Sequence, residues 1–316
     1  MELQNKIDEM VQSKSAEMLL RNLIDYAGLF PPACLSLNEA VQNYAAYLRG
    51  SDGWMLGSYI HPASSIQELK PYVGAFSDRE LSISALGRKS ESYRECLKLL
   101  EEDLDTVASF EKEHRERVRI TAFELPLPPS IPEEHDIEQL SVLTSDYDMT
   151  LYCEITFAFG EDWYEQMLKA LDCFANYNKT APYPIGMKLR TGGVKAEMIP
   201  APGQLAAFIA ACRDRKLPLK FTAGLHHPVR MYREEVNAKM HGYVNVFTGC
   251  LFAHKYQLGE ESIKEILNED DPSRFSLAGD KLAWGAWKLQ QKKFKNCVNH
   301  FYIHMAPAVL MSPALR

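Results

Sequence analysis

The amino-acid sequence predicts an α/β fold, a (β/α)8 TIM barrel with an N-terminal helix and a C-terminal extension. Short apolar runs alternate with amphipathic segments along most of the 316 residues, which is typical of βα units and a parallel sheet. The runs recur at intervals of about 25 to 38 residues, the length of one βα unit. We expect a single domain, with the barrel over residues 20–270 and the extension over residues 271–316.

Eight strands are expected from the apolar runs. Eight βα units within about 250 residues match a closed barrel better than an open doubly wound sheet, which is the alternative architecture. The expected strands begin near Asn22, Trp54, Glu80, Val118, Met149, Ile185, Leu217 and Tyr243.

Helices are expected in four segments that carry apolar side chains on one face at the helical period. These segments are residues 37–48, 93–107, 163–174 and 205–212. The first begins with Ser36-Leu37-Asn38-Glu39, a capping-box pattern in which the Ser hydroxyl and the Glu carboxylate satisfy free amides at the helix start. A further helix is expected over the first 20 residues.

The composition argues against several classes of protein. A net charge of −7 does not suit a general nucleic-acid binder, because neutralising phosphates needs a clustered excess of Lys and Arg. The sequence has no apolar run of about 18 residues and no basic leader, which predicts a cytoplasmic protein with no membrane partner. The 7 cysteines are scattered without a C-x-x-C pair and predict reduced thiols. The expected partner is a small-molecule substrate, and a homo-oligomer is left open.

Catalytic groups are expected where the strands end, because the active sites of such barrels are built from the βα loops. Ten polar residues are expected at these ends: Asp25, His61, Glu124, Glu154, Lys188, Arg190, Lys220, His226, His227 and Asn245. Asp25 begins a Gly-Pro-containing loop that is expected to cover the substrate. Asp25 and Asn245 are taken as substrate-binding candidates.

The sixth expected strand carries two cations on one face. Side chains alternate along a strand, so Lys188 and Arg190 point the same way, and on a buried face they need carboxylates or a bound anion. The glycines that follow let backbone amides approach an anion closely. The substrate-binding residues expected here are Arg190, Thr191, Gly192 and Gly193. The alternative is that both cations pair with Glu154 only for stability.

The seventh expected strand repeats this pattern with Lys220 and Thr222 on one face, followed by Ala223-Gly224. Two lysines on adjacent strands are expected to depress each other's pKa, which is one way to obtain a neutral amine nucleophile at pH 7. Lys188 and Lys220 are therefore candidate catalytic residues. Thr222 and Gly224 are candidates for substrate binding.

This pair of strands resembles the deoxyribose-phosphate aldolase branch of Schiff-base aldolases. Neighbouring strands in that family carry a Lys-Thr-x-Thr-Gly type segment and a Lys-x-x-Gly-Gly type segment. The counterparts are Lys188 to Gly192 and Lys220 to Gly224, and the likeness covers about 15 residues. Arg190 and the His226-His227 pair depart from it. The resemblance implies lysine-dependent carbon–carbon lyase chemistry by analogy.

The adjacent histidines follow the second lysine. Neighbouring side chains of an extended chain point in opposite directions, so only one of the two is expected to reach a given ion or proton. His226 is the candidate general acid or base, and His227 is a candidate for substrate binding. A metal-ligand role and a structural role remain the alternatives for each.

Glu124 and Glu154 are expected to face the same bowl, one as a proton acceptor and the other as an ion-pair partner. The alternative is a structural ion-pair lattice. A second hypothesis for the enzyme is a divalent-metal site formed by Glu124, Glu154 and His226, with Asp25 as a further candidate ligand, which would carry out hydrolysis or enolisation. No other cofactor is predicted. A third hypothesis is a non-catalytic, ligand-binding barrel.

Three longer segments resemble those of an uncharacterised bacterial TIM-barrel-like family. They are residues 25–33 (DYAGLFPPA), 188–193 (KLRTGG) and 222–228 (TAGLHHP). This likeness groups the motifs and implies no particular reaction. It also implies a tail like Gly-Ser-Cys-Ser-Phe-x-Glu-Pro, whereas this chain has His304-Met305-Ala306-Pro307 and a different ending. Codons for the observed tail permit the family tail in another reading frame, so we expect a frameshift near residues 295–302; divergence of the tail is the alternative.

These features predict an enzyme that acts on a small anionic metabolite bearing a phosphate or a carboxylate. The expected chemistry is that of a lysine-dependent carbon–carbon lyase or isomerase, with Lys188 or Lys220 as amine nucleophile or proton donor and a histidine or Glu154 as proton shuttle.

Overall fold

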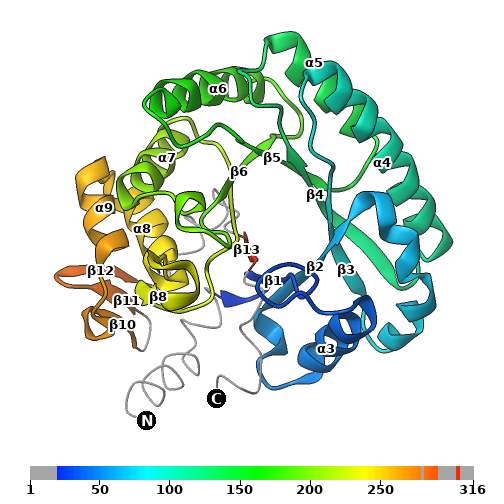
Figure 1. Ribbon diagram of the computed structural model, residues 1–316, viewed down its shortest axis with the longest axis horizontal. Helices are drawn as coiled ribbons and strands as arrows, with labels where there is room; N and C mark the ends of the chain where they lie inside the picture. The colour runs from blue at the N-terminus through cyan, green and yellow to red at the C-terminus, as the bar shows by residue number, and fades with distance from the viewer. Residues whose placement is uncertain (1–19, 279–280, 291–303, 307–316) are drawn as a thin grey trace.

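A computed structural model describes residues 20–278, 281–290 and 304–306. The N-terminal helix and the frameshift that the sequence led us to expect lie mostly or wholly outside these residues. Seven parallel strands form one curled sheet in the order in which they occur along the chain (Figure 1). They are β1 (Ile24–Tyr26), β2 (Leu56–Pro62), β3 (Leu81–Leu86), β4 (Val118–Pro126), β5 (Thr150–Glu154), β6 (Gly186–Arg190) and β7 (Leu219–Thr222).

The gap between the first and the seventh strand is bridged by a segment far along the chain. The short strand β13 (His304–Ala306) pairs in parallel with β7 and with β1. Lys220 has His304 as its register partner, and Ile24 has Met305. All seven strands that form the curled sheet start within about two residues of the predicted positions, as expected for short, strongly apolar runs.

The prediction of an eighth strand that begins near Tyr243 is wrong. This segment forms the helix α8 (Tyr243–Tyr256), and ten consecutive residues of it, Val244 to Ala253, are buried. A segment whose residues are almost all apolar can be either a buried strand or a buried helix. Its hydrophobic periodicity therefore cannot distinguish the two structures. Here the helix is covered by α7 and α9.

Helices lie outside the curled sheet and bury its outer face (Figure 1). They are α3 (Leu37–Arg49), α4 (Tyr93–Glu113), α5 (Glu134–Thr144), α6 (Trp163–Asn178), α7 (Pro202–Asp214), α8 and α9 (Glu260–Asn268). A 14-residue 3₁₀ segment, η2 (Ala63–Phe76), takes the helix position between β2 and β3. The predicted capping box at α3 is confirmed, because Ser36 Oγ accepts from Glu39 N and the Glu39 carboxylate accepts from Ser36 N.

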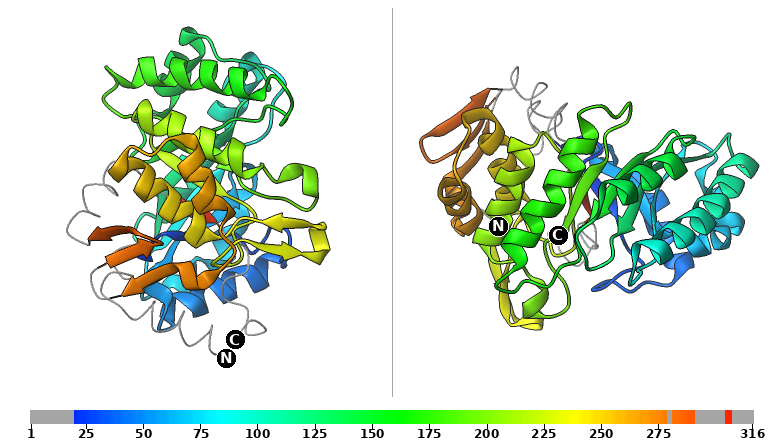
Figure 2. Two further views of the ribbon diagram at one scale, coloured as in Figure 1. Left: turned by 90° about the vertical axis from the view of Figure 1, so that its left-hand side faces the viewer. Right: turned by 90° about the horizontal axis from the view of Figure 1, so that it is seen from above.

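Short elements complete the fold. They are the 3₁₀ turns η1 (Gly53–Met55), η3 (Ala196–Met198), η4 (Glu234–Val236) and η5 (Pro272–Arg274), and the strands β8 (Met231–Arg233) and β9 (Ala238–Met240). β8 and β9 form an antiparallel hairpin that projects from one end of the curled sheet (Figure 2).

The predicted extension forms a small sheet of its own beside α8 and α9 (Figure 1). Its antiparallel strands are β10 (Phe275–Ala278), β11 (Lys281–Trp284) and β12 (Trp287–Gln290). The Trp284 indole donates to the Glu269 carboxylate at 3.2 Å, which ties this sheet to the end of α9. No helix within the described ranges is long and apolar enough to span a membrane.

Candidate active site

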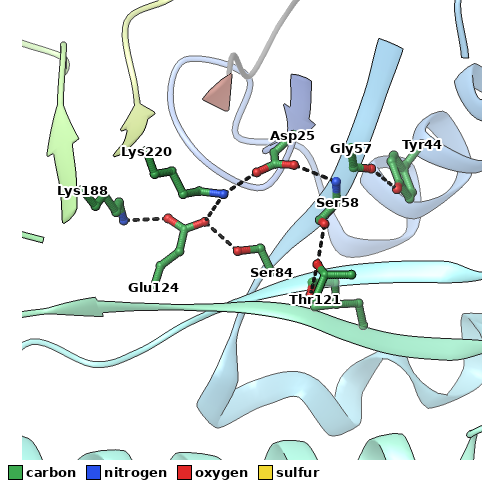
Figure 3. Close-up of polar contacts among 10 residues, drawn as sticks. Asp25, Tyr44, Gly57, Ser58, Ser84, Thr121, Glu124, Lys188 and Lys220 are labelled. Atoms are coloured by element: carbon green, nitrogen blue, oxygen red, sulfur yellow. Dashed lines mark hydrogen bonds and ion pairs between the residues drawn. The ribbon is translucent and has the colours of Figure 1, made fainter. Parts of the chain in front are cut away.

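A cluster of two lysines and three carboxylates fills the interior of the curled sheet. Lys188 of β6 and Lys220 of β7 are register partners, and each points toward Glu124 of β4 (Figure 3). Glu154 of β5 and Asp25 of β1 complete the cluster. Alternation along the strands explains this convergence, because residues that face inward on each strand meet at the axis.

Lys188 lies between two glutamates. Its Nζ is 2.7 Å from Glu124 Oε2 and 2.7 Å from Glu154 Oε2. The Lys188 side chain is only 3% exposed, so these ion pairs are shielded from water. Distances this short are typical of charge-assisted hydrogen bonds, which fix the lysine head group in place.

Lys220 lies between the other oxygen of Glu124 and a second acid. Its Nζ is 3.1 Å from Glu124 Oε1 and 2.5 Å from Asp25 Oδ2. The second oxygen of Asp25 accepts the backbone N–H of Ser58 at 2.7 Å. Ser84 donates to Glu124 Oε1 at 2.7 Å. Glu124 therefore joins both lysines, and a serine orients it.

The cluster has one more acid than base, so it carries an excess negative charge when every group is ionised. Burial disfavours the charged form of Glu124, but the ammonium groups of Lys188 and Lys220 outweigh it and lower its pKa to about 2. Burial lowers the pKa of Lys188 and Lys220 in the same way, and the neighbouring carboxylates outweigh it and raise both pKa values above their usual range.

The expectation that the two lysines depress each other's pKa is therefore wrong for this arrangement. Glu124 lies between the two Nζ atoms and contacts both. Each lysine also has an acid of its own, Glu154 or Asp25. Attraction to nearby carboxylates exceeds the repulsion between the two cations, and both lysines rest as ammonium ions.

A cavity of about 340 Å³ opens where the strands end. Lys188 and Glu124 line it, together with Arg190 from the end of β6 and Thr222 from the end of β7. Lys220 lines a different cavity, of about 660 Å³, at the opposite end of the curled sheet, together with Tyr152 and Ser58. The structure thus separates the two candidate lysines, because one faces the strand ends and the other faces the strand starts.

The loops after β6 and β7 touch each other at two glycines. A Cβ on Gly192 would lie 2.5 Å from the Cα of Gly224, so neither position has room for a side chain. Gly224 and Ala223 both have positive φ, 75° and 64°. Thr191 ties the two loops together, because its hydroxyl donates to the Ala223 carbonyl at 2.5 Å and its N–H donates to the Thr222 carbonyl.

Not all of the predicted anion-binding segment lines the cavity. Gly193 and Arg190 do, whereas Thr191 is fully buried between the loops and Gly192 packs on Gly224. Arg190 is exposed and makes no ion pair with any residue in the described part of the chain. Under the alternative, both cations of this strand would pair with Glu154; in the described residues Lys188 makes this pair and Arg190 does not.

The two histidines after β7 differ in their position relative to the cavity. His226 lines the cavity, and burial lowers its pKa to about 4, with a smaller contribution from His227. Its Nδ1 atom has no hydrogen-bond partner among the described residues. His227 is outside the lining of the cavity, and burial lowers its pKa as well.

Asn245 is not at the end of a strand. It lies in α8, where its side chain binds three backbone groups: Oδ1 accepts from Arg230 N at 2.9 Å, and Nδ2 donates to the carbonyls of Ile266 and Glu269 at 2.8 Å. Its position was inferred from the strand wrongly predicted at Tyr243. The sequence His61-Pro62 after the second strand predicts a histidine in a solvent-exposed turn, and this prediction is wrong. His61 is buried in β2, and its Nε2 lies 3.2 Å from the Ser65 carbonyl.

Sequence reasoning missed several residues of the cluster's surroundings. Ser84 orients Glu124, and the β8–β9 hairpin contributes Glu235, Val236 and Met240 to the cavity. Ser84 had a usable signal, since Ser82-Ile83-Ser84 alternates polar and apolar residues and places both serines on the inner face. The β8–β9 hairpin had no such signal in the sequence, because it does not come directly after a long apolar run of the kind that predicts a strand.

The geometry does not favour the metal hypothesis. Among the described residues, no three His, Cys, Asp or Glu side chains are arranged so that they could hold a metal ion. Glu124 and Glu154 meet at Lys188 instead, and in the described part of the chain no hydrogen bond or ion pair joins either of them to His226. No family model and no curated protein matches this sequence.

Proposed function

We propose that this protein is a lysine-dependent carbon–carbon lyase or isomerase of a small anionic carbonyl compound, and that Lys188 is its reacting lysine. The observation that carries this proposal is that Lys188 lines the cavity at the strand ends, whereas Lys220 lies at the far side of Glu124. Catalytic groups of such barrels come from the ends of the strands. We also infer that the fold is a (β/α)8 barrel in which β13 takes the place of the eighth strand.

Lys188 rests as an ammonium ion, so imine formation begins with loss of one proton. The neutral amine then adds to the carbonyl carbon, and the carbinolamine takes the proton back as it expels water. An ammonium ion and a carbonyl compound thus give an iminium ion and water, with no net change in charge. The carboxylates that stabilise the ammonium ion are equally placed to stabilise the iminium ion.

Glu154 is the proton acceptor in this proposal. Glu124 is a poor acceptor, because two lysines and Ser84 hold it and its pKa is about 2. Among the described residues, Glu154 forms an ion pair with Lys188 alone, at 2.7 Å. An acceptor within hydrogen-bond distance of the proton it takes is the geometry that general base catalysis needs.

Borohydride trapping tests the proposal. The full chain is incubated with a panel of small oxo acids and aldehydes, reduced, digested and mapped by mass spectrometry. The expected result is a secondary-amine adduct at Lys188. An adduct at Lys220 alone, or at surface lysines only, would overturn the assignment; binding of a carbonyl ligand with neither adduct nor turnover would favour a non-catalytic barrel.

A further inference from the structure

The cavity beside Lys188 has two chemically different halves. Its polar half is formed by β4, β6, β7 and the loop after β7 through Glu124, Lys188, Arg190, Thr222 and His226. Its apolar half is formed by the ends of β1 to β3, the loop after β1 and the β8–β9 hairpin. The residues of this apolar half are Phe30, Pro32, Ile60, Leu86, Val236 and Met240.

Both cations that line the cavity come from one strand. Lys188 and Arg190 are two residues apart on β6, which places their Cα atoms about 7 Å from each other. An anionic group bound at Arg190 therefore lies near the carbonyl group that meets Lys188. No lysine or arginine of the described chain lines the apolar half, so nothing there would hold an anion at the other end of the ligand.

Two polar atoms of residues that line the cavity have no hydrogen-bond partner among the described residues. They are the hydroxyl of Thr222, whose residue is 7% exposed, and Nδ1 of His226. Thr222 is the register partner of Arg190, so its hydroxyl lies next to the same strand end. A buried polar atom without a partner is costly, and a ligand oxygen would satisfy both atoms.

The apolar half has little to offer a hydroxyl group. The side chains of Phe30, Ile60, Leu86 and Met240 can neither donate nor accept a normal hydrogen bond. The Glu235 carboxylate is also at the hairpin, but it is exposed and bound to Arg233 Nε at 2.7 Å. A sugar chain, with a hydroxyl on nearly every carbon, would lose its hydrogen bonds to water on entering this half.

We propose that the substrate is a small oxo acid with a hydrocarbon tail that carries no hydroxyl groups. Its carboxylate binds Arg190 and the Thr222 hydroxyl, its carbonyl group meets Lys188, and its tail lies against Ile60, Leu86 and Val236. This inference rests on the proposed function for the role of Lys188. The tail preference itself depends only on the lining of the cavity.

Calorimetry on the full chain tests the inference with a matched pair of probes. These are 4-methyl-2-oxopentanoate and 4,5-dihydroxy-2-oxopentanoate, which are similar in size and share the head group. We expect the first to bind at least about tenfold more tightly, because the hydroxyl groups of the second stay unpaired. Equal binding, or tighter binding of the dihydroxy compound, overturns the substrate class.

Two nearly isosteric variants locate the two ends of the ligand. Val236→Thr places a hydroxyl in the apolar half and is expected to weaken binding of the apolar acid about fivefold. Thr222→Val removes the protein hydroxyl that is proposed to bind the carboxylate of the ligand. It is expected to weaken binding of both acids to a similar extent. Val142→Thr, at an exposed position of α5, is the control and should change neither. Loss of affinity in the control as large as in Val236→Thr would contradict the assignment.

The outcome separates this inference from the proposed function. Preference for the apolar acid without a borohydride adduct supports the substrate class and removes the lysine chemistry. The opposite outcome is an adduct at Lys188 that forms best with the dihydroxy acid or with 2-deoxyribose 5-phosphate. It overturns the substrate class and leaves Lys188 as the reacting lysine.

Discussion

Glu124 places one carboxylate oxygen 2.7 Å from Lys188 Nζ, and both side chains are almost completely buried. The other oxygen of the same carboxylate is 3.1 Å from Lys220 Nζ. Removing this acid therefore leaves two buried ammonium groups short of a counter-charge. The following predictions depend on this arrangement and on the loops around it.

Glu124→Gln should lower the free energy of unfolding by about 3–5 kcal/mol, because breaking a buried ion pair leaves an uncompensated charge. Denaturant unfolding of the two chains measures the difference. Glu113→Gln is the matched control, since Glu113 pairs with Lys70 at the exposed surface, where solvent screens the interaction. If both variants were equally stable, the buried cluster would have no special role in stability.

Stability should fall in acid in two stages. His226 and His241 have folded pKa values of about 4, below the ordinary 6.5, chiefly through burial. The unfolded chain binds protons there first, so stability drops as the pH falls from about 6.5 to about 4. Glu124, with a folded pKa of about 2 against an ordinary 4.5, adds a second loss between about 4.5 and 2.

Denaturation midpoints measured from pH 8 to pH 3 test this order. His226→Gln should reduce the first stage to the contribution of His241 and leave the second stage in place. The two lysines predict the opposite behaviour in base, because their raised pKa values stabilise the fold until the pH exceeds about 10.5. A midpoint that stayed constant from pH 8 to pH 4 would contradict the assignment of neutral, buried histidines.

Gly192→Ala should destabilise the fold by about 1–3 kcal/mol, because its Cβ would lie 2.5 Å from the Cα of Gly224. The clash is with backbone, so relieving it requires one of the two loops to shift. Gly203→Ala provides the comparison. Its Cβ would have its nearest neighbour, Lys264 Cδ, at 3.9 Å, so this variant should be neutral or slightly stabilising. Thermal unfolding distinguishes the two, and equal transitions would show that the two loops are not in contact.

Arg190→Gln should weaken the binding of an anionic ligand about tenfold or more while leaving the unfolding transition unchanged. The physical reason is that Arg190 lines the cavity and makes no ion pair with any described residue, so its charge is free for a ligand. Arg119→Gln, which removes the ion pair with Asp148 elsewhere on the surface, should leave binding intact. Calorimetry with pyruvate compares them, and undiminished affinity in Arg190→Gln would rule out the anion site.

Much of the sheet follows from the sequence, because each of the seven strands of the curled sheet is a short apolar run bounded by polar residues. The convergence of Glu124, Glu154 and Lys188 also follows, since the ends of neighbouring strands lie close together. Lys220 was expected at the same end, but it lines the cavity at the strand starts. The pairing of the acids with the lysines does not follow. Which acid contacts which lysine depends on side-chain reach across the axis, which alternation alone leaves undetermined.

The segment that closes the gap between β1 and β7 was not predicted, for a different reason. The run that begins at Tyr243 is rich in β-branched and aromatic residues, yet burial against α7 and α9 favours a helix there. The strand that pairs with β1 and β7 comes instead from His304–Ala306, which follows the end of β7 at Thr222 by about 80 residues. Such long-range pairing leaves no local signal in so short a segment.

The most direct test of the central claim compares borohydride trapping in Lys188→Met and Lys220→Met. Both substitutions remove an ammonium group and keep an unbranched side chain, so they perturb the cluster to a similar extent. Circular dichroism first checks that both variants are folded. Our account predicts that Lys220→Met still forms an adduct at Lys188 with an oxo acid, and that Lys188→Met forms no adduct. An adduct that persists in Lys188→Met and disappears in Lys220→Met would contradict it.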